Sequence, residues 1–129
     1  MPKKKLKPEV ELAQSTIVYR GKGAPGLRPT LVTCTDMGGE HQLPIEPSQR
    51  IRKHSIEFSW GYGGSGPAQL ALAILLDVTG KLVEAEENYQ DFKFEFVAKW
   101  DQHGDWAIGD YTIWRWLEER ETKGGGDHG

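Results

Sequence analysis

The sequence predicts an α+β domain, in which a small antiparallel sheet of three or four strands is followed by three packed helices. Runs of β-branched and alternating apolar residues lie before residue 61. The helical patterns lie after residue 66. Strands that precede helices along the chain favour helices packed on one antiparallel sheet. With 129 residues, the chain has room for one modest hydrophobic core.

Four segments carry strand patterns. The β-branched runs at residues 16–20 and 30–35 are separated by a glycine- and proline-rich loop. Residues 40–45 are a candidate edge strand after the turn signal at residues 36–39, because a proline near their end cannot donate to a central ladder. Residues 54–60 alternate strictly between polar and apolar side chains, which is the clearest strand pattern of the chain.

Three helices are predicted after a glycine-rich segment. Pro67 suits the first turn of the first helix, Gly66 is then its N-cap, and Gly80 is its C-cap. The stretch between them is apolar on nearly every side, so we expect this helix at the centre of the domain or at the interface of a homo-oligomer. A second helix over residues 83–99 has an aromatic stripe and an acidic face, and a third begins at a capping Asp110.

The two ends of the chain, its charge and its cysteine content narrow the classes of protein to which it can belong. Residues 1–14 and 122–129 are predicted to be flexible tails, which leaves a single domain over residues 15–121. The lysines near the N-terminus fit a solvated end, with a partner-binding arm as the alternative. A net charge of −3 provides no general attraction to nucleic acid or to an anionic membrane. One cysteine, no signal peptide and no apolar run of membrane-spanning length predict a cytoplasmic protein.

The glycine-rich segment at residues 61–68 partly matches three known motifs, two that bind nucleotides and one that carries a catalytic serine. Its G-x-G-x-x-G spacing precedes a helix, but no second strand with an acidic end follows, as a dinucleotide fold requires. A P-loop would need a lysine that the segment lacks. A nucleophile elbow would need a glycine two residues after Ser65, where Pro67 stands. None of the three motifs is complete.

Two interpretations of this segment remain open. Backbone N–H groups in a glycine-rich turn that leads into a helix N-terminus can bind an anion such as a phosphate group. Glycines also occur where a chain must turn tightly against a packed helix. For an anionic or nucleotide-like ligand, the candidate ligand-binding residues are Trp60, Gly61, Tyr62, Gly63, Gly64, Ser65, Gly66, Ala68 and His54. Trp60 or Tyr62 would stack on a ring of that ligand.

Catalysis and metal binding have weaker support. A hydrolase or nuclease would need Ser65, a histidine such as His54 and a carboxylate to converge, so the sequence leans toward no enzyme. The histidines show no metal-ligand spacing, and the polar residues at 101–105 fit a loop between helices better than a metal site. We therefore expect no metal and no cofactor. Cys34 lies in a predicted strand, where a small buried residue is the favoured interpretation.

A protein-interaction surface is the alternative function. The acidic face of the second helix, with Glu84, Glu87 and Asp91, is either a solvated surface or a docking site for a basic partner. The tryptophans from residue 100 onward favour core packing, with a partner-binding hot spot as the alternative. Tryptophans exposed beside the acidic face would favour docking.

Several stretches carry a family resemblance: RKHSIEFSWGYGGSGPAQLALAILLD, then YQDFKFEFVAKW, then IWRWLEE. Together they resemble an uncharacterised family of small prokaryotic and phage proteins, a domain of unknown function with a WGYGGSGPAQLALA signature. At residues 52–55 the chain has Arg-Lys-His-Ser where that family has Asn-His-Ser-Pro. The resemblance implies a shared fold. It also implies a protein that phages or other mobile elements encode and that acts in the cytoplasm of the host cell. It implies no activity, but suits a binder of a phosphate-bearing small molecule or an inhibitor of a host or defence protein.

Overall fold

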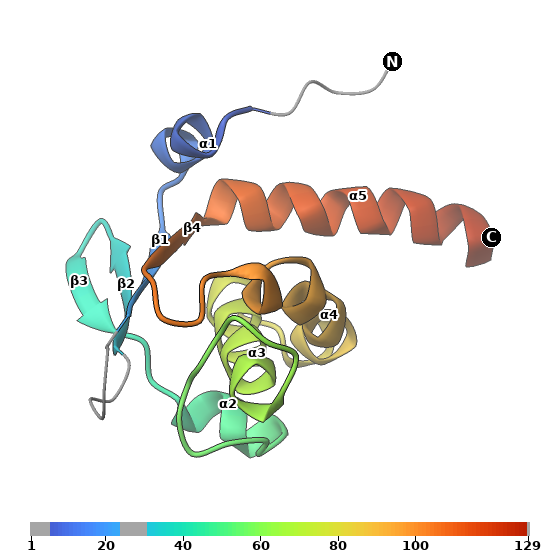
Figure 1. Cartoon of the computed structure of the whole chain (residues 1–129). Helices are drawn as coiled ribbons and strands as arrows, with labels where there is room; N and C mark the ends of the chain where they lie inside the picture. Colours follow the sequence, from blue (N-terminus) through green and yellow to red (C-terminus); the bar gives the residue numbers. More distant parts are fainter. Residues whose placement is uncertain (1–5, 24–30, 129) are drawn as a thin grey trace.

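The computed structural model describes residues 6–23 and 31–128, with side chains up to residue 121, and confirms an α+β fold. Its sheet has four antiparallel strands in the order β3-β2-β1-β4 (Figure 1). The strands are β1 (Val18–Lys22), β2 (Leu31–Asp36), β3 (Gly39–Gln42) and β4 (Trp106–Gly109). The predicted loop between β1 and β2 lies largely outside the described residues.

The helices, in chain order, are α1 (Pro8–Gln14), α2 (Glu46–Ile51), α3 (Ser65–Thr79), α4 (Leu82–Glu95), the 3-10 turn η1 (Val97–Lys99) and α5 (Asp110–His128). Helix α3 is the centre of the core, since every residue from Gly66 to Leu75 is buried. It packs mainly against α4 and also against α2, while the sheet and α5 lie on its other sides (Figure 1). The apolar helix is therefore covered within one chain.

The ends of the core helices follow their sequence signals in part. Gly80 ends α3 with a left-handed φ of 67°, as predicted for a C-cap glycine. The N-cap of α3 is Gly64 and not Gly66, so the helix begins two residues earlier than predicted. Asp110 begins α5, but its carboxylate accepts hydrogen bonds from the backbone N–H and the hydroxyl of Thr16. This aspartate thereby joins the last helix to the start of β1.

The clearest strand prediction, residues 54–60, is wrong. This segment is irregular, and the side chain of Gln69 on α3 accepts hydrogen bonds from the backbone N–H groups of His54 and Ser55. Phe58 and Trp60 are buried as the alternation predicts, but Ile56, on the same predicted face, is 78 % exposed. Two buried aromatic side chains in an irregular segment therefore produced the alternation without a neighbouring strand.

Regular structure also appears where none was predicted. The fourth strand, β4, follows the helices and pairs with β1, with Val18 opposite Gly109. Helix α1 lies in the predicted N-terminal tail because the buried Glu11 forms an ion pair with Arg115 of α5, at 3.1 Å. Helix α5 continues through residues 122–128, which were predicted to be part of a tail. Helix α2 lies after β3, where no helix was expected.

Candidate functional site

The glycine-rich segment is packed tightly between α3 and the turn that follows α4. Gly61 has a φ of 89°, which only glycine adopts readily. Its N–H donates to the carbonyl of Val97 at 3.0 Å, and a Cβ on Gly61 would lie 2.5 Å from the Cα of Gln102. Both the conformation and the close approach of another backbone therefore require glycine at this position.

Two side chains near Gly61, those of Ser59 and Tyr62, pack against the start of α3. A Cβ on Gly66 would lie 1.8 Å from the hydroxyl oxygen of Ser59, and one on Gly64 would lie 2.5 Å from the ring of Tyr62. The hydroxyls of Ser59 and Tyr62 are hydrogen-bonded at 2.8 Å. The glycines thus leave room for a seryl and a tyrosyl side chain of the same segment.

A buried cation lies under the segment. Lys93 of α4 is 6 % exposed, and its ammonium group donates to the carbonyl oxygen of Gly63 at 3.2 Å. Burial lowers the pKa of Lys93, because desolvation disfavours its charged form. This lysine binds the backbone of the segment and does not face open solvent.

The predicted ligand-binding residues do not share one surface. Trp60 is 1 % exposed and donates its indole N–H to the carbonyl of Gly104, so it has no free face for a ligand. Ala68 is buried, whereas Tyr62 is 43 % exposed and Gly63 and Ser65 are also at the surface.

His54 is directed toward α4. Its Nε2 lies 2.7 Å from the hydroxyl of Tyr89, and no described hydrogen bond joins it to Ser65. The convergence that a hydrolase needs is therefore not seen among the described contacts.

Gln69, within the same sequence signature, has a structural role that the sequence did not reveal. Its side chain is fully buried and makes four hydrogen bonds. Its oxygen accepts from the N–H groups of His54 and Ser55, and its nitrogen donates to the hydroxyl of Ser48 and the carbonyl of Arg52. One amide thus fixes α2 and the following loop to α3.

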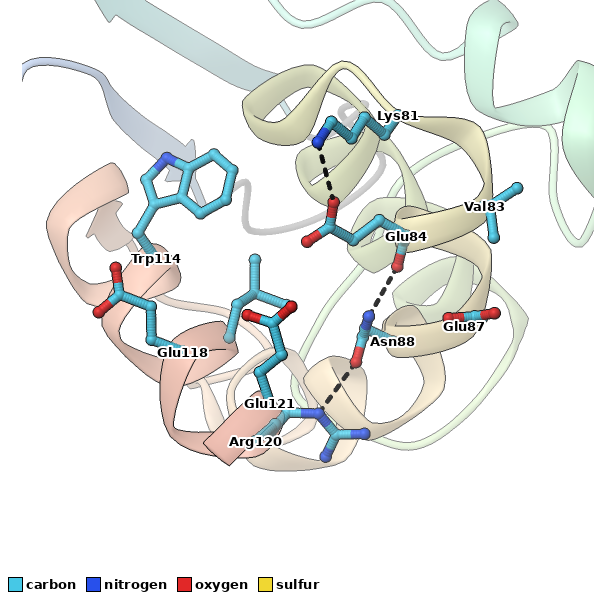
Figure 2. Close-up of a pocket in the computed structure, with 10 residues that line it drawn as sticks. Lys81, Val83, Glu84, Glu87, Asn88, Trp114, Glu118, Arg120 and Glu121 are labelled. Atoms are coloured by element: carbon cyan, nitrogen blue, oxygen red, sulfur yellow. Dashed lines mark hydrogen bonds and ion pairs between the residues drawn. The ribbon is translucent and has the colours of Figure 1, made fainter. Parts of the chain in front are cut away.

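An open groove of about 880 Å³ lies between α4 and α5. Figure 2 shows Trp114 of α5 and Glu84 of α4 on its opposite sides, with both side chains directed into it. The lining residues are Lys81, Val83, Glu84, Glu87, Asn88, Trp114, Leu117, Glu118, Arg120 and Glu121. Two residues of the predicted acidic face are thereby brought beside an indole.

Charge in this groove is predominantly negative. Four glutamates line it against one lysine and one arginine. Arg120 is already occupied, because it donates to Asn88 at 3.0 Å and forms an ion pair with Asp91 at 2.7 Å. Lys81 lies 4.0 Å from a carboxylate oxygen of Glu84. Asp91, predicted as part of the docking face, lies outside the groove.

The tryptophans divide between core and surface. Trp100 stacks on Trp106 with ring centroids 3.9 Å apart, and Trp116 packs edge-on against Phe92 at 5.5 Å. Trp114 is 36 % exposed on the wall of the groove. Helical spacing alone does not distinguish Trp114 from Trp116, since only the packing of α5 on α4 determines which indole is covered.

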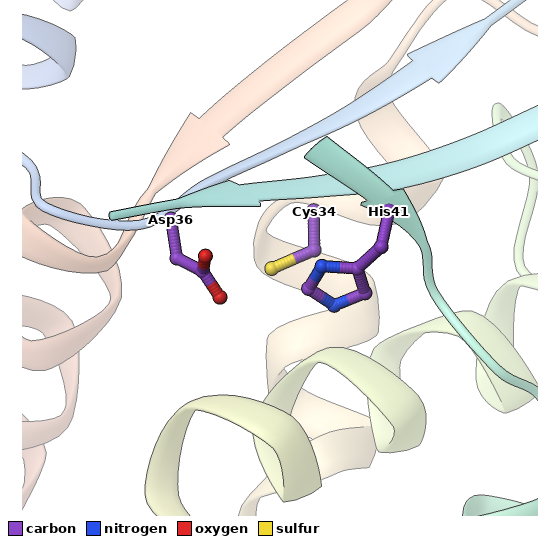
Figure 3. Close-up of side chains that lie close together, drawn as sticks. All are labelled: Cys34, Asp36 and His41. Carbon is purple, nitrogen blue, oxygen red and sulfur yellow. The ribbon is translucent and has the colours of Figure 1, made fainter. Parts of the chain in front are cut away.

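A second polar cluster lies on the β2–β3 hairpin. The Sγ of Cys34, a carboxylate oxygen of Asp36 and a ring nitrogen of His41 lie within 4.8 Å of one another (Figure 3). Burial and the nearby carboxylates of Asp77 and Asp36 raise the pKa of the Cys34 thiol to about 11. This cluster was not predicted from the sequence, although pairing residues across the predicted turn at 36–39 places Cys34 opposite His41.

Comparison with known proteins identifies the chain at the level of a family. The family model described as "Family of unknown function (DUF6166)" matches residues 19–119. Searches of curated proteins and of solved structures find no match. None of the helices in the described part of the chain has the length and apolarity needed to cross a bilayer.

Proposed function

The chain belongs to DUF6166, a family of unknown function, and we propose that it is a protein-interaction module. In this proposal, the groove between α4 and α5 binds a basic segment of a partner protein that also carries an apolar anchor. The observation that carries the proposal is the exposure of Trp114 in a groove that Glu84 and Glu87 also line; Figure 2 shows Glu84 across the groove from Trp114 and Glu87 farther away on α4.

Apolar area is the first requirement of such a site. Trp114 is 36 % exposed on one wall, and Val83 is 69 % exposed at the opposite edge. Leu117 lies in the floor and is 6 % exposed. Tryptophan is enriched among the few residues that dominate binding energy, and such residues lie inside a rim that excludes water. An aliphatic or aromatic side chain of the partner would be buried between Trp114 and Val83.

Charge is the second requirement. Glu87 is exposed and takes part in none of the described ion pairs, and Glu84 has only the distant ammonium of Lys81. Since the two cations that line the groove are already near carboxylates, a lysine or arginine of the partner would meet the carboxylate of Glu87. Complementary charges at a rim accelerate association and discriminate between partners.

The biological setting is a further part of the proposal. A small binding module of a phage or another mobile element is suited to act as an inhibitor that occupies a basic surface of a host or defence protein. The acidic and partly apolar character of the groove supports this class of partner, since nucleic-acid-binding surfaces are basic.

Site-specific photocrosslinking tests the proposal. A photoreactive phenylalanine analogue replaces Val83 in the groove, or, as a control, Met37, which is 97 % exposed on the β2–β3 turn. In a host-cell lysate, we expect a discrete crosslinked product from position 83 and none from position 37.

Charge-reversal variants then show whether the groove itself carries the binding. In the crosslinking protein, Glu84→Lys with Glu87→Lys is expected to weaken capture at least about fivefold, since exposed ion pairs contribute roughly 1 kcal/mol. The matched control is Glu40→Lys, an exposed acid on β3. No product specific to position 83, or a product that the double variant forms as well as the control, would refute the proposal.

An anion site at the N-terminus of α3 is the second candidate function. No described hydrogen bond takes the backbone N–H of Ser65 or Gly66, and Ser65 and the partly exposed ring of Tyr62 are accessible. Thermal shift with inorganic phosphate and with mono-, di- and cyclic nucleotides tests it. Stabilisation that Ser65→Ala reduces would support this candidate, and no stabilisation at millimolar ligand would exclude it.

A further inference from the structure

We propose that the β2–β3 hairpin and the end of α3 form a site for a divalent transition-metal ion, for which Zn²⁺ is the best fit. The ligands are Cys34, Asp36 and His41 of the hairpin, with Asp77 of α3 as the fourth. The proposal is independent of the docking groove, which lies between α4 and α5.

The register of the hairpin brings its three ligands to one face. Cys34 lies directly opposite His41, and Asp36 follows Cys34 by two residues, so the three side chains leave the sheet in the same direction. Figure 3 shows them projecting from the strands toward the helices, and their ligand atoms lie within 4.8 Å of one another. Cys34 is buried and the other two are exposed, so an ion can enter from solvent.

The fourth ligand comes from the opposite side of the cluster. The Oδ2 atom of Asp77 lies 3.8 Å from the Sγ of Cys34. The same oxygen accepts a hydrogen bond of 2.7 Å from the hydroxyl of Tyr19, which is completely buried. Hydrogen bonds of this kind orient ligating carboxylates in metal sites. Tyr19 is therefore a positioning residue for Asp77.

The donor set and the charge both favour a borderline-soft cation. One sulfur, one imidazole nitrogen and carboxylate oxygens are ligands of Zn²⁺, whereas Mg²⁺ and Ca²⁺ prefer oxygen alone. Asp36 uses Oδ1 to accept the N–H of Gly38 at 2.8 Å, which leaves its other oxygen for an ion. Neither Asp36 nor Asp77 takes part in any ion pair among the described residues.

The three hairpin ligands, and the pair of Cys34 with Asp77, are close to the spacing that an ion needs, while Asp77 is outside the group of ligand atoms within 4.8 Å of one another. Bonds of about 2.0–2.3 Å in a tetrahedron separate ligand atoms by about 3.3–3.8 Å. The distance from Sγ to the Asp77 oxygen, 3.8 Å, already fits this range, and the hairpin ligands must approach by about 1 Å, within the reach of side-chain rotation. Binding converts the Cys34 thiol to a thiolate and releases its proton to solvent.

The test uses untagged protein in a non-thiol reductant and Co²⁺ as a spectroscopic substitute for Zn²⁺. We expect saturable binding of one Co²⁺ per chain, with sulfur-to-cobalt charge-transfer absorption and the intense visible bands of a tetrahedral site. Zn²⁺ should abolish both and raise the midpoint of thermal unfolding, because the ion joins the edge of the sheet to α3.

Variants separate this site from adventitious binding. His41→Gln changes an exposed side chain, so the fold is expected to survive, and binding should fall at least about tenfold. Cys34→Ser should remove the charge-transfer absorption. The matched control is His103→Gln, an exposed histidine outside the cluster. No saturable Co²⁺ spectrum, or one that His41→Gln leaves as strong as His103→Gln does, would overturn the proposal.

Discussion

Replacement of Gly61 by alanine tests whether the folded structure requires a glycine at this position of the signature. The φ of 89° places this residue in the left-handed region, where a side chain costs about 1–2 kcal/mol. The new Cβ would also lie 2.5 Å from the Cα and 2.6 Å from the backbone N of Gln102. These are backbone atoms, so rotation of a side chain cannot relieve the contact.

The magnitude follows from adding the two effects. Overpacking against a rigid neighbour costs about 1–3 kcal/mol, so Gly61→Ala should lower the free energy of unfolding by about 2–5 kcal/mol. Gly80→Ala is the matched control, because Gly80 also has a positive φ, of 67°, but a Cβ there meets nothing within 4 Å. That control should cost only about 1–2 kcal/mol.

Urea unfolding at fixed pH, followed by tryptophan fluorescence, compares the two variants. With a urea dependence of about 1–3 kcal/mol/M, the midpoint of Gly61→Ala should lie clearly below that of Gly80→Ala. Equal midpoints would show that the segment moves away from Gln102 without cost. The close approach would then not be what requires glycine at position 61.

Three further predictions concern the core. Gln69→Leu should lower the free energy of unfolding by about 2–5 kcal/mol in urea, since it leaves four buried or partly buried hydrogen-bonding groups without the side-chain amide. A loss below about 1 kcal/mol would contradict the structural role of Gln69. Glu11→Ala should cost about 3 kcal/mol by leaving Arg115 without its closest carboxylate; an unchanged urea midpoint would show that α1 is not part of the folded domain. Because the pKa of the buried Cys34 thiol rises from 9.0 to about 11, stability present below pH 9 should fall by about 3 kcal/mol as pH passes 11. The Cys34→Ala variant should lose less stability over that pH range. An equal loss of stability would exclude the thiol as the cause of the pH dependence.

The elements that the sequence predicted well have local causes. Gly80 ends α3 through its own left-handed backbone conformation, so this boundary was readable without tertiary structure. Asp110 does begin α5, but its carboxylate binds Thr16, far away in the sequence. The paired runs of β2 and β3 were readable for the same reason, since a glycine turn connects them directly. The composition of α3 predicted a helix covered on nearly every side, at the centre of the domain or at an oligomer interface, and the structure places it at the centre.

The failures have long-range causes. Residues 54–60 are irregular and pair with no strand; at their start one buried amide, from Gln69, takes the backbone N–H groups of His54 and Ser55. Strand β4 is only four residues long, and its identity depends on β1, far away in the sequence. Helix α1 is held by the ion pair of Glu11 with Arg115. In each case the deciding partner lies on a distant part of the chain.

The candidate sites also differ in how far local sequence or long-range packing determines them. Glycine spacing drew attention to residues 61–68, but their amides and carbonyls are in part bound within the fold. The acidic face of α4 was visible in the sequence, but only the position of α5 brings Trp114 beside it. The hairpin cluster was within reach of the sequence, because register follows from the turn, although Asp77 could not have been added to it.

The pairing of β1 with β4 has a consequence for how the protein is made. Val18 meets Gly109 only after β4 has been synthesised, long after β1, so one edge of β1 remains unpaired until then. Contacts between such distant segments also slow folding. Chains truncated before Trp106 should therefore leave that edge of β1 exposed permanently and aggregate.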